Sequence, residues 1–171
     1  MKLLTLNCHS WQEDNQIEKI KYLAKIIKEK QYDVIALQEV SQKINSKLLQ
    51  AMIKEDNFAQ LLIEELNKIN ESKYNFIWDY SHIGYDIYEE GLAILTKHKI
   101  KDCKSFYVSK SDNKRNYRSR KIISITVNIE GNEVDFYSCH TGWWNDDIEP
   151  FKYHADMLIE NISDDRLAFV M

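Results

Sequence analysis

Three apolar runs of the sequence each lead to a polar residue that suits the chemistry of metals and phosphates. They are LLTLN, ending at Asn7, DVIALQE, ending at Glu39, and VDFYSCH, ending at His140. Each run is typical of a buried β-strand, and ligand sites gather at the carboxyl ends of strands in sheets packed by helices. We therefore expect the amide, the carboxylate and the imidazole to meet in one site.

Glu39 is the strongest candidate for a metal ligand. Mg²⁺ binds proteins through one or two carboxylates, and waters and substrate phosphates complete its coordination. Asn7 stands at the matching place on the neighbouring strand, where it could hold the metal's water or a phosphate oxygen. Taken singly, Glu39 could be a solvated acid at the start of a loop and Asn7 an Asx-turn residue. Their coincidence at one edge favours the metal site.

His140 is the candidate for phosphate contact, because it follows a strand and precedes Thr141-Gly142. An imidazolium at this place can donate to a phosphate oxygen and stabilise the charge that develops in the transition state. A carboxylate behind the ring would orient it and favour its charged form. Glu90, just before the GLAILT run, and Glu89 are the candidates. The alternatives are a buried histidine satisfied by backbone and an acid that merely ends a strand.

Two further groups are candidates for substrate contact. Trp143 and Trp144 follow His140 directly, and aromatic side chains in such loops can stack on a base, a sugar or a lipid head group. For one of the two, packing over the sheet is the alternative. A basic segment is the second group, and most of its side chains are expected to be solvated. Arg118 or Arg120 is the expected exception, because the next strand fixes both. The segment contains Lys110, Lys114, Arg115, Arg118, Arg120 and Lys121.

The first half of the chain predicts a parallel pair of strands joined by a helix. Residues 2–6 and 34–38 read as strands, and the apolar spacing over 16–29 predicts an amphipathic helix between them. A second helix is expected to end at Ile69, with Phe58, Leu61, Leu62 and Leu66 on its apolar face. We expect residues 41–56 to be irregular or weakly helical.

The second half predicts mostly strands, over 74–80, 91–96 and 102–108. Residues 121–129 and 133–139 then flank the hairpin turn Glu130-Gly131-Asn132. Pro150 begins a predicted helix that runs to Ile162, with Phe151, Met157, Leu158 and Ile162 facing inward. Residues 166–170 read as another buried strand. A buried strand at the end of the chain leaves ladder groups without partners, so we expect either truncation or association through the unfinished sheet.

Composition limits the classes of protein that remain. The 171 residues, 44% of them hydrophobic, are enough for one domain with a substantial core. The net charge of −4 gives no general attraction to nucleic acid or to an anionic membrane. No signal peptide and no run of roughly 20 apolar residues occurs, which argues against stable insertion in a membrane. The three cysteines read as reduced thiols, so we expect a cytoplasmic protein.

The order LTLN, DVIALQE, EEGLAILTKHKI and FYSCHTGWW resembles the endonuclease/exonuclease/phosphatase family, and the resemblance spans residues 1–171. It implies one domain with a four-layer α/β/β/α sandwich, a deoxyribonuclease-I-like α/β fold. It also implies Mg²⁺ or Mn²⁺ and hydrolysis of a phosphoester, whether nucleic acid, nucleotide or phospholipid head group. Glu39 matches the family's main metal ligand, Asn7 an asparagine near metal and phosphate, and His140 the histidine on the scissile phosphate. Glu90 aligns with the acid that pairs with that histidine.

The sequence departs from the family's pattern after Met171. Family members continue with a GDFN-type motif and, further on, with an Asp-His pair, and none of these residues is present. The fold is therefore expected to lack its C-terminal third, and the site its means of activating water. We expect a metal-dependent phosphoester hydrolase that is truncated. The alternative is a non-catalytic domain that binds metal or phosphate or serves an interaction role.

Overall fold

The computed structural model describes residues 1–69 and 73–171 of the chain. Ten strands and three helices occur in these ranges, in the order β1 (Leu3–Asn7), α1 (Gln16–Lys30), β2 (Val34–Lys43), β3 (Leu48–Gln50), β4 (Ile53–Lys54), α2 (Phe58–Ile69), β5 (Asn75–Gly84), β6 (Tyr88–Thr96), β7 (Ile100–Tyr107), β8 (Lys121–Ile129), β9 (Asn132–Cys139), α3 (Phe151–Asn161) and β10 (Leu167–Val170).

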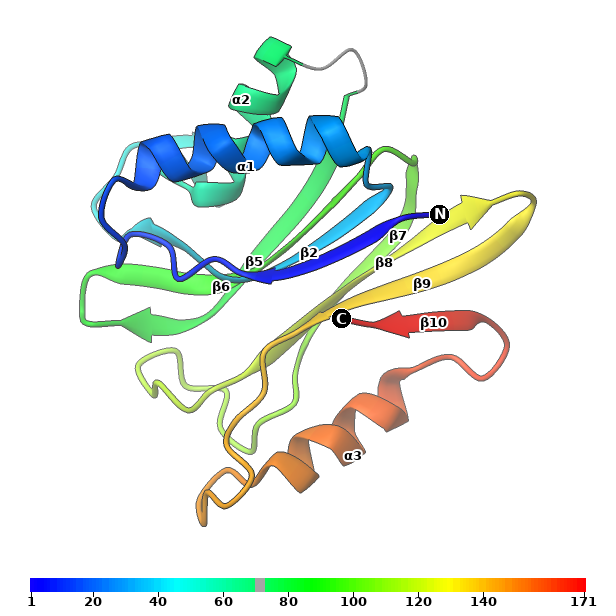
Figure 1. The fold of residues 1–171 in the computed structure, drawn as a ribbon. Coiled ribbons are helices and arrows are strands. Elements are labelled where there is room, and N and C mark those ends of the chain that lie inside the picture. The colour runs from blue at the N-terminus through cyan, green and yellow to red at the C-terminus, as the bar shows by residue number, and fades with distance from the viewer. Residues whose placement is uncertain (70–72) are drawn as a thin grey trace.

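Two four-stranded sheets pack face to face, with helices on both outer faces (Figure 1). The strand order is β1-β2-β6-β5 in the first sheet and β10-β9-β8-β7 in the second. The edge strand β1 pairs with β2 in parallel, and the edge strand β10 pairs with β9 in parallel. The other strand pairs of these two sheets are antiparallel. The predicted parallel pair of β1 and β2, joined by α1, is confirmed.

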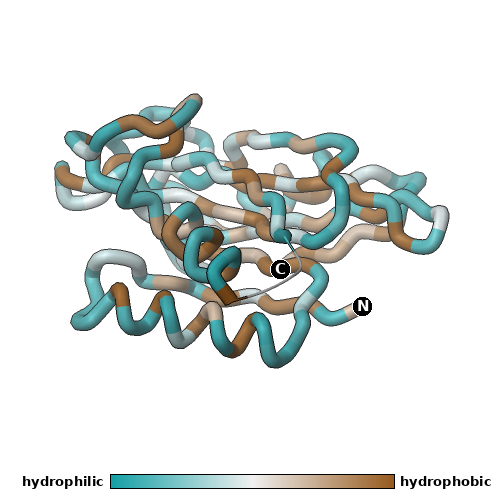
Figure 2. The backbone as a smooth tube through the Cα atoms, turned by 90° about the horizontal axis from the view of Figure 1, so that it is seen from above, coloured by the Kyte–Doolittle hydropathy of each residue, from teal (hydrophilic) through white to brown (hydrophobic). Residues whose placement is uncertain are grey.

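Apolar side chains fill three cores, one between each pair of layers. The helices α1 and α2 turn one apolar face toward the first sheet, and residues of opposite hydropathy alternate along them (Figure 2). Phe136 lies between the two sheets among β-branched residues and stacks on Phe169 with ring centroids 5.2 Å apart. Met157 and Leu158 of α3 pack on the outer face of the second sheet. The predicted four-layer α/β/β/α sandwich is confirmed.

The prediction for residues 41–56 was wrong. The strand β2 does not end near Glu39 but continues to Lys43, and β3 and β4 form a short hairpin after it. A buried side chain holds this hairpin in place, because Gln42 donates to Met52 O and accepts from Lys54 N. The sequence does not reveal this hairpin, because its strands are only two and three residues long and Leu48 and Leu49 are exposed rather than turned to a core.

The edge strands are less buried than predicted. In β1 the side chains of Leu4 and Leu6 are half-buried, and in β10 Leu167 and Val170 are 62% and 52% exposed. Each of these strands has a neighbour on one side only, so one row of backbone groups remains open. In the part of the chain that the structure describes, no helix is long and apolar enough to cross a membrane.

Two β-bulges flank Gly91 of β6 and turn side chains of the neighbouring strands toward one place. On β2 the register shifts between Leu37 and Val40, and on β5 it shifts between Tyr80 and His82. Bulges re-aim side chains in this way beside functional sites. A Cβ on Gly91 would lie 2.0 Å from the carbonyl oxygen of Asp79, so only glycine fits between the two bulged strands.

Candidate active site

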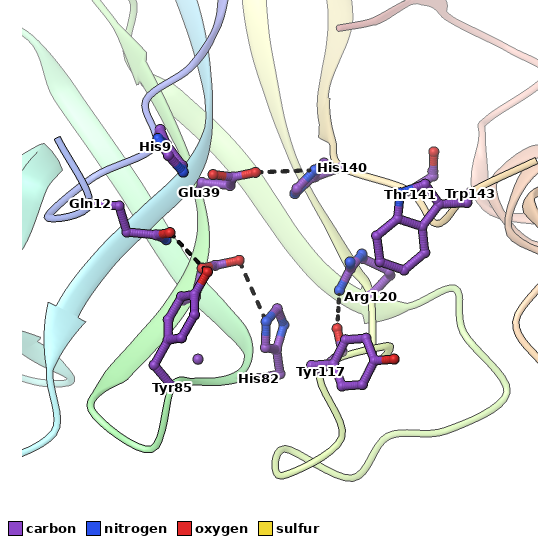
Figure 3. A pocket seen from close by; sticks show the side chains of 12 residues that line it. His9, Gln12, Glu39, His82, Tyr85, Tyr117, Arg120, His140, Thr141 and Trp143 are labelled. Atoms are coloured by element: carbon purple, nitrogen blue, oxygen red, sulfur yellow. Dashed lines mark hydrogen bonds and ion pairs between the residues drawn. The ribbon is translucent and has the colours of Figure 1, made fainter. Parts of the chain in front are cut away.

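A cavity of about 540 Å³ opens where the two sheets meet, and both sheets supply its walls (Figure 3). The first sheet contributes residues of the two bulged strands and of β6, and the second sheet contributes the segments that precede β8 and follow β9. The lining residues are His9, Gln12, Glu39, His82, Gly84, Tyr85, Glu90, Tyr117, Arg120, His140, Thr141 and Trp143.

Glu39 lies at the centre of the three predicted residues. The side-chain amide of Asn7 donates to Glu39 Oε1 at 2.8 Å, and His140 Nε2 lies 3.6 Å from the same oxygen. The structure therefore brings Asn7, Glu39 and His140 together. The backbone N–H of His9 donates to Asn7 Oδ1 at 3.0 Å, which turns the amide N–H toward the site. In this orientation Asn7 orients the Glu39 carboxylate, and its role in holding the metal's water or a phosphate oxygen stays a prediction.

The backbone at Glu39 is held in an unusual conformation by a single buried serine. Glu39 has a φ of 51°, in the left-handed region that non-glycine residues rarely adopt. Because β1 ends at Asn7, the following part of β2 has no strand on that side. Ser10, 1% exposed, occupies this place: its hydroxyl donates to Glu39 O at 2.6 Å and accepts from Ser41 N at 2.7 Å. Ser10 thereby fixes the bulge that aims the Glu39 carboxylate into the cavity.

His140 directly follows β9, as predicted, and its side chain is half-buried. Burial and the positive charge of Arg120 lower the pKa of His140, while Glu39 acts in the opposite direction. The neutral imidazole is therefore the favoured form of the ring, in contrast to the predicted imidazolium. A neutral ring still carries one N–H that can donate to a phosphate oxygen.

The predicted pairing of Glu90 with His140 was wrong. Glu90 Oε1 instead lies 3.5 Å from His82 Nε2, its cross-strand neighbour on β5, while Glu39 is the carboxylate beside His140. Burial, and then the Glu39 carboxylate, raise the pKa of Glu90. Burial, and then Arg120, lower the pKa of His82 to about 4. The shift at His82 keeps its imidazole neutral at pH 7, and the raised pKa of Glu90 makes this carboxyl easier to protonate than an exposed glutamate.

Of the two arginines considered, Arg120 and not Arg118 lines the cavity. The side chain of Arg120 is 8% exposed and donates to the carbonyl oxygens of Tyr117 and Ser119. Arg118 turns away, donates from Nε to Asp146 Oδ2 at 2.9 Å, and lies over the ring of Tyr117. The prediction that Arg118 contacts substrate is not supported by this geometry.

The two tryptophans also lie in different surroundings. Trp143 lines the cavity and is 60% exposed, so a stacking role remains open to it. Trp144, 75% exposed, packs against Phe151 of α3 with ring centroids 5.6 Å apart and does not line the cavity. The predicted substrate contact through Trp144 is therefore not supported.

Sequence reasoning missed His82 and Tyr85. Pairing of the strands around the turn at Gly84 would have placed His82 opposite Glu90, and this was the available signal. Tyr85 reaches across the mouth of the cavity, where its hydroxyl donates to Gln12 Oε1 at 3.0 Å. Tyr117 lies in the basic segment, where no apolar pattern indicates its direction.

The donor set suits a hard cation that takes few protein ligands. Among the described residues, no group of three or more His, Cys, Asp or Glu side chains could hold a metal ion by itself. Mg²⁺ needs only one or two carboxylates, with water and phosphate oxygens beside them. The hydrogen bonds and ion pairs of the described residues engage Glu39 through Oε1, so Oε2 is free to bind such an ion. Cys8 and Cys139 take no part, because burial raises the pKa of both thiols.

Two stacked β-sheets between helices carry an asparagine, a glutamate and a histidine together at one end. The model of the endonuclease/exonuclease/phosphatase family matches residues 5–170, and the chain belongs to this family. Family members are in general hydrolytic enzymes that use divalent metals.

Solved structures agree with this assignment. A family protein from Leptotrichia buccalis C-1013-b is 43% identical, with a TM-score of 0.96, and the match covers 100% of this chain and 66% of that one. A functionally unknown conserved protein from Enterococcus faecalis V583 is 14% identical, with a TM-score of 0.67 and coverage of 100% and 65%. TDP2 from Caenorhabditis elegans is 17% identical, with a TM-score of 0.53 and coverage of 81% and 34%. No curated protein matches the chain.

The chain thus spans slightly less than two thirds of the length of the Leptotrichia protein. At 14% and 17% identity, the other two structures show the shared fold alone.

Proposed function

We propose that the cavity is the binding part of a metal-dependent phosphoester hydrolase, with Glu39 anchoring Mg²⁺ and His140 contacting the phosphate. The observation that supports this most is the convergence of Asn7 and His140 on one oxygen of Glu39, from separate segments of the chain. A bound Mg²⁺ would act as a Lewis acid on the phosphoryl oxygens.

The protein's own residues would position the phosphate and neutralise its charge. Arg120 supplies a permanent positive charge at the buried end of the cavity. His140 supplies an N–H donor, and Asn7 keeps the carboxylate of Glu39 in a fixed direction. Donors that are already in place at the developing charge stabilise a transition state without further reorganisation. We assign the activation of water to none of these residues.

The size of the cavity favours a small phosphoester. A volume of about 540 Å³ suits a ligand of nucleotide or head-group size, within the usual 300–1,000 Å³ of such sites. Tyr85, Tyr117 and Trp143 are exposed aromatic residues of its lining and offer stacking surfaces. The net charge of −4 and the engagement of Arg118 by Asp146 weigh against a dedicated enzyme for duplex DNA.

The second candidate is a domain that binds metal and phosphate without turnover. It is favoured by the small number of acidic ligands, since Glu39 is the carboxylate beside both Asn7 and His140. Association through the open edges of β1 and β10 remains a proposal that belongs to either candidate.

Hydrolysis of bis-p-nitrophenyl phosphate with and without Mg²⁺ separates the two candidates. The hydrolase predicts turnover that requires Mg²⁺ and falls at least a hundredfold in Glu39→Gln, but not in Glu160→Gln, an exposed glutamate of α3. Binding of Mg²⁺ and inorganic phosphate without turnover would favour the second candidate. Equal turnover by Glu39→Gln and wild type would refute the proposed role of Glu39.

A comparison of substrates then addresses the class of phosphoester. A mononucleotide phosphodiester, a single-stranded oligonucleotide, an abasic duplex, sphingomyelin vesicles and an inositol phosphate form the panel. The size of the cavity predicts that the smaller substrates are used better than the abasic duplex.

A further inference from the structure

A pair of buried ionisable side chains outside the cavity connects two of its walls. Glu149 and His154, 3% and 0% exposed, lie with His154 Nε2 3.4 Å from Glu149 Oε2. Neither residue lines the cavity. Burying ionisable side chains costs free energy unless they are fully paired. The hydrogen bonds that these two residues make to both walls should therefore explain why they are buried there.

His154 holds the segment that follows His140. Its Nδ1 accepts a hydrogen bond from the backbone N–H of Gly142 at 3.0 Å. An accepting Nδ1 assigns the ring proton to Nε2, which faces Glu149, and burial lowers the pKa of His154 in agreement with a neutral ring. The contact is close, because a Cβ on Gly142 would lie 2.9 Å from His154 Cε1.

Glu149 holds the opposite wall, the basic segment that leads into β8. Its two carboxylate oxygens accept from the backbone N–H of Lys110 at 2.9 Å and of Ser111 at 3.0 Å. Asp146 strengthens the connection, since its carboxylate accepts from Glu149 N at 2.9 Å and from Arg118 Nε at 2.9 Å. The predicted substrate residue Arg118 thus belongs to this network.

We propose that Glu149 and His154 are positioning residues, a buried clamp that fixes the segment from His140 to Trp143 against the basic segment. The clamp would set the direction of the His140 ring and the place of Trp143 at the mouth of the cavity. It acts through the backbone of Gly142 and contacts neither metal nor phosphate. Its functional part rests on the function proposed above.

Hydrogen exchange at single amides tests the clamp without any ligand. His154→Phe keeps a ring of similar size but removes the acceptor, so exchange of Gly142 N–H should rise at least tenfold. Glu149→Gln keeps one carbonyl acceptor, whereas Glu149→Leu keeps none. Exchange at Lys110 and Ser111 should therefore rise in the order wild type, Glu149→Gln, Glu149→Leu.

The matched control removes a buried hydrogen bond elsewhere. Thr126→Val deletes the bond from Thr126 Oγ1 to Asp135 Oδ1, 2.6 Å long, between β8 and β9. This variant should lose stability without a selective change at Gly142. Equal exchange at Gly142 in His154→Phe and Thr126→Val, at matched loss of thermal stability, would overturn the clamp.

Binding of inorganic phosphate tests the functional part. NMR titration should show affinity at least threefold weaker in His154→Phe, with shifts at the indole N–H of Trp143, and unchanged affinity in Thr126→Val. Rapid exchange at Gly142 with unchanged phosphate affinity would refute the positioning role. If the wild type binds no phosphate, the proposed function fails, and the exchange data still decide whether the clamp exists.

Discussion

Substitution of Ser10 by alanine should destabilise the protein by disturbing the bulge at Glu39. The hydroxyl of Ser10 stands where β1 has ended and supplies one acceptor and one donor to β2. In Ser10→Ala the carbonyl of Glu39 keeps the backbone N–H of residue 10 as a partner, at 3.3 Å. The N–H of Ser41, a residue 1% exposed, loses its acceptor.

The expected loss of stability follows from the hydrogen bonds that are lost and kept. A buried N–H left without a partner costs about 1–3 kcal/mol. The left-handed conformation of Glu39 stores about 1–2 kcal/mol, part of which is released if the bulge relaxes. We therefore expect a net loss of about 1–2 kcal/mol, or a decrease of roughly 2–8 °C in Tm for a domain of this size.

Urea unfolding at pH 7 measures this loss, and Ser105→Ala is the matched control. The hydroxyl of Ser105 also donates a short hydrogen bond, to Asp79 Oδ2, but on the exposed strand β7. It should change stability by less than about 0.5 kcal/mol. An equally small effect of Ser10→Ala would show that Ser10 does not hold the bulge, and the explanation of how Glu39 is aimed would be wrong.

Two further perturbations test the surroundings of the cavity. Gly91→Ala would bring a Cβ to within 2.0 Å of Asp79 O, so we expect the free energy of unfolding to fall by more than about 3 kcal/mol. The control is Gly131→Ala, at a φ of 92° in open space, which should cost about 1 kcal/mol. Similar effects of both variants in urea unfolding would contradict the role of Gly91. Between pH 6.5 and about 4 the unfolded state binds a proton at His82 that the folded state does not, so the contribution of His82 to stability should fall by about 3 kcal/mol as the pH decreases. His82→Gln should flatten this profile, and parallel profiles for both proteins would refute the burial argument.

Much of the fold could be predicted because apolar patterns reflect packing. The parallel pair of β1 and β2 and the hairpin of β8 and β9 are largely buried, so their sequences carry apolar runs bounded by polar residues. The turn at Glu130-Gly131 could be predicted because both residues adopt positive φ, and glycine marks such turns. The β3–β4 hairpin could not, because Gln42 stabilises it through polar bonds that leave no period.

Only those residues of the candidate site could be predicted whose positions follow from the order of the strands. Asn7 and His140 follow predicted strands, and their convergence on Glu39 required only the order of the sheets. The bulges that turn Glu39 and His82 into the cavity depend on close contacts around Gly91, which the spacing of residues does not reveal. The partner of Glu90 changed for the same reason, since a one-residue shift of register moves a side chain to the other face.

The most direct test of the central claim is binding of Mg²⁺ at Glu39. Isothermal titration with MgCl₂, together with NMR shifts of the Asn7 side-chain amide, locates the ion without any need for turnover. We predict saturable binding by wild type and Glu160→Gln, and at least tenfold weaker binding by Glu39→Gln, equivalent to about 1.4 kcal/mol. Equal affinity of Glu39→Gln and wild type for Mg²⁺ would contradict the assignment of Glu39 as the metal anchor.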